Sequence, residues 1–111
     1  MKVIKSGEGA HYDAPNHFNM WGVRKIGPAD GAKALNMSIS EFLPHGGATL
    51  SKSDKERVYC VLRGSITVSD EAGKAYVVDE NDMIYIAPGE QRAIAVNGLV
   101  AARLLVVIAN C

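Results

Sequence analysis

The sequence predicts an all-β domain that folds as a sandwich or a barrel. Short runs rich in β-branched and aromatic residues alternate with clusters of Gly, Asp and Asn, which is typical of strands joined by tight turns. Eleven glycines interrupt the chain. No window carries the sustained i, i+3, i+4, i+7 apolar pattern of an amphipathic helix. Together these features indicate about nine or ten short strands.

Each expected strand is an apolar-rich run that ends in a turn. The segment HFNMWGVRKI contains Trp21, the chain's single tryptophan, and the sequences PHGG and DEAGK are expected to be turns. The early loop GEGAHYDAPNH is rich in Gly, Pro and Asn, so it is expected to be the least constrained part, a lid or an arm. The expected strands cover residues 3–5, 17–26, 33–43, 57–63, 65–69, 75–78, 83–86, 92–96 and 100–108.

One carboxylate interrupts the apolar pattern of a strand. In the segment 33–43, Leu35, Met37 and Ile39 share one face, and Glu41 follows on the same face. If that face is buried, Glu41 is a carboxylate with a raised pKa and a candidate general acid. The alternative is that Glu41 lies at the edge of its strand.

The length of 111 residues fits one domain with its own core. Residues 33–111 are expected to form the core of a barrel, and residues 1–32 an N-terminal arm whose strands pack on the barrel or on a dimer partner. The runs VYCVL and LLVVI are apolar on both faces, whereas an antiparallel strand with one solvated face alternates. We therefore expect a second copy of the chain to cover the outer face, giving a homodimer.

Charge and composition argue against several classes of partner. The 12 basic and 12 acidic residues leave no net charge to attract nucleic acid or an anionic membrane surface. The apolar run near Leu104 is far shorter than the ~20 residues that cross a bilayer. The start, MKVIKSGEG, has no apolar signal-peptide core, and Cys60 and Cys111 make no disulfide framework. These features favour a reduced, cytoplasmic protein.

Two stretches, residues 44–64 and 81–97, run from a turn cluster into a short apolar strand. Gly64 closes the first after VYCVLR, and Gly89 lies in the second, NDMIYIAPGEQR. This pattern of hydrophobic residues and glycines resembles the cupin superfamily, in which two motifs lie on strands of a small jelly-roll β-barrel. The resemblance covers roughly residues 33–109 and implies a small, single-domain, type-2-like cupin.

The resemblance also locates the family's metal-binding positions, and their residues differ here. Counting back from Gly64, the family's glutamate position falls on Arg57 and its two histidine positions fall on Ser51 and Ser53. The histidine position of the second motif falls on Arg92. A divalent metal needs imidazole, carboxylate or thiolate ligands, and guanidinium has no lone pair to donate. We expect that the usual cupin metal is absent and that no cofactor takes its place.

The same positions would suit an anion. Strand alternation places Arg57 and Tyr59 on one face, and guanidinium groups with hydroxyls recognise carboxylate or phosphate. The predicted ligand-binding set is therefore Ser51, Ser53, Arg57, Tyr59 and Arg92. In the alternative, Arg57 and Arg92 pair with Glu56, Glu90 or Asp54 and fill the barrel.

The three histidines lie outside the two motifs. His11 and His17 fall in the N-terminal region, and His45 falls in PHGG. They could ligate a metal from positions that the family does not use, or supply an acid or base for a metal-free reaction. His17 is the best candidate because it stands beside Phe18, Met20 and Trp21.

Three functions remain open at this point. The first is a metal-independent small cupin that binds a small acidic metabolite in its barrel. The second is an enzyme, either a metal-free isomerase or lyase that uses Glu41, Tyr59 or His17 as acid or base, or a metalloenzyme with His11, His17 and His45 as ligands. The third is a structural module with a filled barrel. The fold alone does not distinguish a carrier, a sensor and an enzyme.

Overall fold

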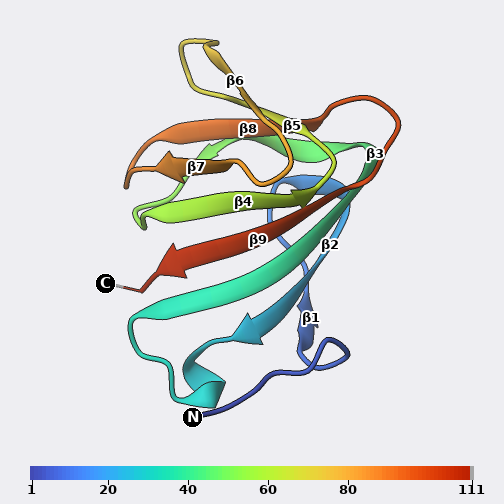
Figure 1. The fold of residues 1–111 in the computed structure, drawn as a ribbon. Coiled ribbons are helices and arrows are strands. Elements are labelled where there is room, and N and C mark those ends of the chain that lie inside the picture. The colour runs from blue at the N-terminus through green and yellow to red at the C-terminus, as the bar shows by residue number, and fades with distance from the viewer. Residues whose placement is uncertain (111) are drawn as a thin grey trace.

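The computed structural model describes residues 1–110, and nine strands account for most of them (Figure 1). This confirms the all-β prediction. One short 3-10 helix, η1 (Pro28–Asp30), joins β2 to β3. The strands are β1 (Ala10–Tyr12), β2 (His17–Ile26), β3 (Leu35–Lys52), β4 (Arg57–Arg63), β5 (Ile66–Ser69), β6 (Ala75–Val78), β7 (Met83–Ile86), β8 (Gln91–Val96) and β9 (Ala102–Ala109).

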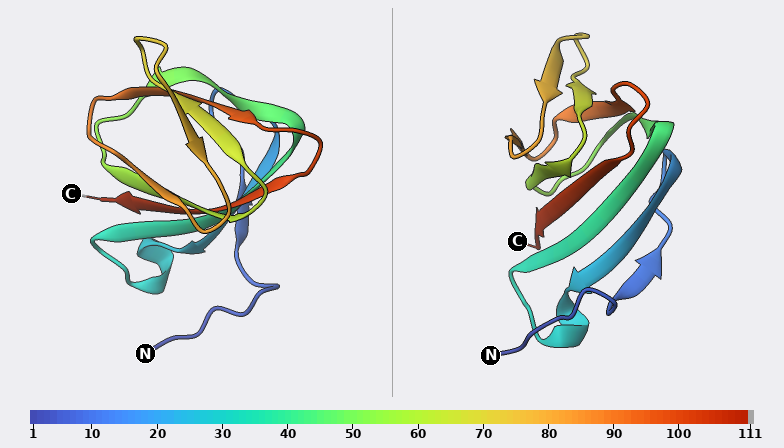
Figure 2. Two further views of the ribbon diagram at one scale, coloured as in Figure 1. Left: turned by 45° about the horizontal axis from the view of Figure 1, so that its top comes forward. Right: turned by 45° about the vertical axis from the view of Figure 1, so that its right-hand side comes forward.

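The long strand β3 joins the two layers of the fold. All pairings are antiparallel; the first half of β3 pairs with β9 and its last residues pair with β8. The strand order is β6-β5-β8-β3-β9-β4-β7, and β2 pairs with β3 and β1. The chain thereby forms a nearly closed jelly-roll barrel (Figure 2). The prediction that PHGG is a turn was wrong, because β3 continues through it from Leu35 to Lys52.

Two glycines and a histidine let β3 bend inside the barrel wall. His45 has a left-handed backbone with φ of 67°. An added Cβ at Gly46 would lie 2.5 Å from the carbonyl oxygen of Asn19, and one at Gly47 would lie 2.1 Å from that of Ile94. Only residues without a side chain allow β2 and β8 to approach β3 this closely. The glycines therefore mark a bend within a strand and a close strand crossing.

The N-terminal region differs from its prediction in two places. Residues 3–5 form no strand, because no other strand pairs with them. The segment around Ser6 and Glu8 is instead fastened by Lys25, whose ammonium donates to both carbonyl oxygens. The loop expected before β2 contains β1, which pairs with β2 from Ala10 opposite Arg24 to Tyr12 opposite Gly22.

The core lies between the layers and follows strand alternation. In β3 the inward residues include Ser38, Ser40 and Phe42, all buried, while Met37 and Ile39 face outward. Within residues 1–110, no helix has the length and hydropathy to span a membrane. The buried apolar residues are Phe42, Ala48, Tyr59, Val61, Ile66, Val68, Val78, Ile86, Ile94, Ala102, Leu104 and Val106.

Candidate functional site

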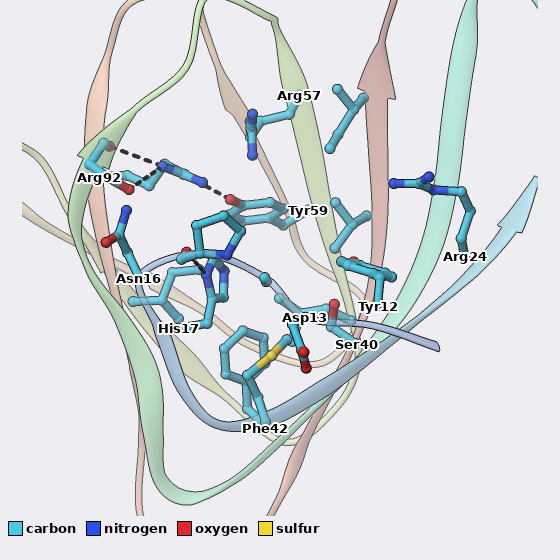
Figure 3. Close-up of a pocket in the computed structure, with 18 of the residues that line it drawn as sticks. Tyr12, Asp13, Asn16, His17, Arg24, Ser40, Phe42, Arg57, Tyr59 and Arg92 are labelled. Carbon is cyan, nitrogen blue, oxygen red and sulfur yellow. Dashed lines mark hydrogen bonds between the residues drawn. The ribbon is translucent and has the colours of Figure 1, made fainter. Parts of the chain in front are cut away.

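A cavity of about 410 Å³ opens into the barrel between the two layers (Figure 3). Its walls come from β2, β3, β4, β8 and β9, and the loop before β2 covers one side. Its lining residues are Tyr12, Asp13, Ala14, Pro15, Asn16, His17, Met20, Arg24, Ser40, Phe42, Ser51, Lys52, Arg57, Tyr59, Arg92, Ile94, Leu104, Val106 and Ile108.

Arg92 is the most deeply buried charge in the cavity wall. Its residue is 6% exposed. Nε donates to the hydroxyl of Tyr59 at 2.9 Å, and Nη1 donates to the carbonyl and hydroxyl oxygens of Ser51 at 2.9 and 3.0 Å. These neutral acceptors orient the guanidinium without neutralising it, and Nη2 has no hydrogen-bond partner within the described residues.

Arg57 adds a second positive charge at the same end of the cavity. It lies on β4 two positions before Tyr59, so strand alternation directs both side chains inward. Figure 3 shows the Arg57 and Arg92 guanidinium groups on either side of the Tyr59 hydroxyl. Because the Tyr59 hydroxyl accepts from Arg92, its own proton remains available to a ligand. This end of the cavity is a cluster of donors.

Two carboxylates close in sequence to these arginines, those of Glu56 and Glu90, form hydrogen bonds with other groups. Glu56 accepts a hydrogen bond from Tyr85 at 2.6 Å, and Glu90 accepts from the backbone N–H of Ala87 at 2.8 Å. Within residues 1–110, neither Arg57 nor Arg92 forms an ion pair with a carboxylate. The filled barrel considered from the sequence, with arginines paired to Glu56, Glu90 or Asp54, is therefore not the arrangement seen here.

His17 lies in the cavity between this donor cluster and Phe42. Its ring centroid is 6.0 Å from that of Phe42, and its Nδ1 is 2.7 Å from the carbonyl oxygen of Pro15. Burial lowers the pKa of His17 below its ordinary value of 6.5, and the positive charges of Arg92 and Arg57 lower it further. The hydrogen bond to Pro15 acts in the opposite direction. The ring is therefore neutral at pH 7.

The loop before β2 is tied to β3, which fixes the position of His17. The carbonyl oxygen of Asn16 accepts from the backbone N–H of Thr49 at 2.8 Å and from its hydroxyl at 3.3 Å. Asn16 has a left-handed backbone with φ of 62°, which asparagine tolerates better than most residues. The same loop brings Asp13 into the cavity wall, and Tyr12 lies under the guanidinium of Arg24 at 5.4 Å.

The structure brings together five of the residues singled out in the sequence and leaves four apart. Ser51, Arg57, Tyr59, Arg92 and His17 line the cavity. The other four, Ser53, Glu41, His11 and His45, are absent from its lining. The Ser53 hydroxyl accepts a hydrogen bond from the N–H of Lys55 at 3.2 Å, and His11 and His45 are exposed. The Glu41 carboxylate lies on the outer face, 3.3 Å from Arg63 and 3.2 Å from Arg103.

Sequence reasoning missed several cavity residues. Asp13 and Asn16 stand in a segment whose Pro, Asn and Asp content signals only a turn. Met20 was noted only as a neighbour of His17, and Ser40 and Phe42 were not distinguished from other strand residues. No local pattern could have found them, because the loop and β3 meet the arginines only through strand pairing.

Comparison with known proteins agrees with this architecture. No family model matches the chain. A curated protein, beta-D-galactosidase Rv1717 of Mycobacterium tuberculosis, is 30% identical over 99% of this chain and 95% of its own length. The polyketide cyclase RemF of Streptomyces resistomycificus superposes with a TM-score of 0.87 at 22% identity, over 98% of this chain and 79% of RemF.

Another solved structure that is similar to this chain is named as a cupin. An RmlC-like cupin of Shewanella frigidimarina superposes with a TM-score of 0.78 at 12% identity, over 100% of this chain and 93% of its own. The chain has the jelly-roll fold of the cupin superfamily. A predicted oxalate decarboxylase of Thermotoga maritima also superposes, with a TM-score of 0.80 at 19% identity over 97% of this chain and 98% of its own.

The donor set of this cavity does not fit the metal that the family resemblance implies. Of the four positions at which the family's ligands are expected, Ser51, Arg57 and Arg92 line the cavity and offer hydroxyl or guanidinium groups. Guanidinium groups repel a cation and donate no lone pair. Within residues 1–110, no three His, Cys, Asp or Glu side chains gather as a metal site. His11, His17 and His45 are therefore not grouped as metal ligands.

The lowered pKa of His17 predicts a pH-dependent stability. Below pH 6.5 the unfolded chain binds a proton at this residue, whereas folded His17 binds it only at lower pH. Stability is therefore greatest above pH 6.5 and is lost as the pH falls through the window below that value. His17→Gln should show a smaller fall in urea midpoint between pH 7.5 and pH 5 than the wild type. An equal fall in both proteins would contradict the prediction.

Proposed function

We propose that this cupin binds a small acidic metabolite, bearing a carboxylate or phosphate, between Arg57 and Arg92. Tyr59 donates a further hydrogen bond, and Ser51 orients Arg92. The cavity of about 410 Å³ supports this proposal, because small-molecule sites typically have about 300 to 1,000 Å³. It also argues against a structural module with a filled barrel.

The observation that carries the proposal is the buried charge of Arg92. A guanidinium held at 6% exposure loses most of its hydration, which costs several kcal/mol unless an opposite charge compensates. Its acceptors, Tyr59 and Ser51, are neutral. An anion that contacts Arg92 and Arg57 would provide the compensating charge. We propose that this anion takes the place of the family's metal, so that the protein acts without one.

A thermal-shift screen with small mono- and dicarboxylates and inorganic phosphate tests the proposal. A ligand at 100 times its Kd stabilises the protein by about 2.7 kcal/mol, which raises the melting midpoint by several degrees. We expect at least one of these anions to produce this shift and Arg57→Ala to reduce it. Arg63→Ala is the control, because it removes the same charge from the outer face. The same shift in wild type and Arg57→Ala, or no shift with any anion, would overturn the proposal.

The mycobacterial relative suggests a second candidate function, the hydrolysis of β-galactosides. Its support is the 30% identity over almost the whole chain. Glycosidases usually need two carboxylates that flank the bond they cleave. Within the described residues, Asp13 is the sole carboxylate in the cavity lining. Release of nitrophenol from a nitrophenyl β-galactoside, lost in Asp13→Asn, would favour hydrolysis over acid binding.

We also propose that the protein is a homodimer, formed through the outer face of β3, β9 and β4. Strand register places apolar side chains side by side on this face. Ile39 and Met37 of β3 lie opposite Leu105 and Val107 of β9. Val107 in turn lies opposite Val58 of β4. A contiguous apolar surface of this kind on a small protein favours association. A second copy presents the same surface and is a suitable partner.

The variant Val107→Lys tests this homodimer. It places a charge in the middle of the apolar outer face, so we expect a mass of one chain by light scattering where the wild type has two. The matched control is Val77→Lys on β6, where the valine is already 62% exposed and lies outside this face. A wild-type mass of one chain would contradict the proposal.

A further inference from the structure

The cavity contains a base as well as an anion site. The Nδ1 atom of His17 lies 2.7 Å from the carbonyl oxygen of Pro15. A carbonyl oxygen can only accept, so Nδ1 carries the hydrogen and Nε2 of the neutral ring holds a lone pair. No hydrogen bond to Nε2 forms within residues 1–110. The ring lines the cavity, so this lone pair is available to a ligand there.

The position of His17 relative to the arginines matters for chemistry. The positive charges of Arg57 and Arg92 both act on its ring, and Tyr59 has a hydroxyl proton to donate. An acid whose carboxylate contacts the arginines would place its neighbouring carbon atoms toward His17. The rest of such a ligand would meet an apolar wall that includes Phe42 and Met20.

We propose that this cupin catalyses proton transfer at carbon in a 2-oxo acid, with Nε2 of His17 as the base. This inference rests on the proposed acid-binding function. The arginines hold the carboxylate, and the base removes a proton from the carbon next to the ketone. A 2-oxo acid is required because a hydrogen on the carbon next to a ketone is far more acidic than a hydrogen on the carbon next to a carboxylate alone.

The step balances without an oxidant, a reductant or another reactant. The C–H bond breaks and an N–H bond forms at Nε2, while the electron pair of the C–H bond moves into a carbon–carbon double bond and the carbonyl pair moves to oxygen. The enolate oxygen accepts hydrogen bonds from Tyr59 and the guanidinium groups, which stabilise charge as it develops. The imidazolium then exchanges its proton with solvent and delivers a solvent hydrogen to carbon, giving exchange, or it gives its proton to the enolate oxygen, giving the enol.

Hydrogen exchange of 4-methyl-2-oxopentanoate in deuterium oxide tests the proposal. Proton NMR follows the loss of the signal from the carbon next to the ketone. A positioned general base contributes about 10²- to 10⁴-fold, so the wild type should exceed the buffer rate by at least about tenfold. His17→Gln should exchange at the buffer rate. His11→Gln is the matched control, since His11 is exposed and absent from the cavity lining, and it should exchange as fast as the wild type.

A second acid separates binding from chemistry. The acid 3,3-dimethyl-2-oxobutanoate has the same carboxylate and ketone but no hydrogen on the carbon next to the ketone. It should raise the melting midpoint of wild type and His17→Gln alike, which also shows that the variant folds. Equal exchange by wild type and His17→Gln would overturn the role of His17. If both acids bind but exchange is no faster than in buffer, proton transfer is overturned and acid binding is not. If neither acid binds, this inference is overturned. The proposed function itself is overturned only if every carboxylate and phosphate in the thermal-shift screen fails to bind.

Discussion

Replacing Arg92 with methionine is expected to weaken the binding of small acids strongly without destabilising the ligand-free protein. Loss of one partner from a buried charge pair costs about 2 to 5 kcal/mol of binding free energy, which weakens binding roughly 30-fold or more. In the ligand-free protein, however, this guanidinium is buried with neutral acceptors only. Replacing a buried ion by an apolar residue of similar volume is often neutral or stabilising.

Two measurements on Arg92→Met separate these effects. Calorimetric titration with the acid that gives the largest thermal shift measures binding, and urea unfolding measures the stability of the ligand-free protein. The control is Arg103→Met, which removes an arginine that contacts Glu41 on the outer face and should leave binding unchanged. A loss of several kcal/mol of unfolding free energy in ligand-free Arg92→Met would mean that its bonds to Tyr59 and Ser51 hold the barrel together.

The arginine end of the cavity could be predicted from the sequence because it depends on strand alternation. Once VYCVLR is a strand, Arg57 and Tyr59 must share a face, and the structure places both in the cavity. The family resemblance then indicated the opposite wall by locating Arg92 and Ser51 at equivalent barrel positions. Both inferences need only short-range geometry and one alignment of motifs.

The inward face of β3 could not be predicted in this way. Its apolar residues Met37 and Ile39 face outward, and Ser38 and Ser40 face the interior. Hydrophobic alternation assigns the apolar face to the core when one face is solvated. Here the outer face is itself apolar, so the pattern cannot decide the direction. This ambiguity made Glu41 a candidate general acid, although its carboxylate lies on the outer face with Arg63 and Arg103.

The other wall of the cavity depends on contacts between distant parts of the chain. Asp13 and Asn16 reach the cavity because β2 pairs with β3 along its length and because Asn16 bonds to Thr49. The register of β2 on β3 shifts twice, so counting residues from a turn would not have given the correct pairing. The extension of β3 through PHGG had the same origin, since β2 pairs with β3 on both sides of this segment, at Phe42 and at Gly47, and β8 also pairs at Gly47.

Gly47→Ala is expected to destabilise the protein by about 3 kcal/mol or more, at the upper end of the cost of overpacking. The new Cβ would lie 2.1 Å from the carbonyl oxygen of Ile94, and a backbone atom cannot rotate away as a side chain can. Gly47 lies opposite Ala95, where β3 leaves the first layer to join β8. Relief of the clash must therefore separate β3 from β8.

Urea unfolding measures this cost, and Gly7→Ala is the control because nothing lies within 4 Å of a Cβ added there. The control should change stability by less than about 0.5 kcal/mol. The same strand separation should move Ser51 away from Arg92, since these residues pair across β3 and β8. The NMR signal of Arg92 Nε–H should therefore shift in Gly47→Ala and not in Gly7→Ala. If the urea midpoint and the Arg92 signal are both unchanged in Gly47→Ala, β3 and β8 separate at Gly47 without loss of stability. In that case this strand crossing does not hold the anion site in place.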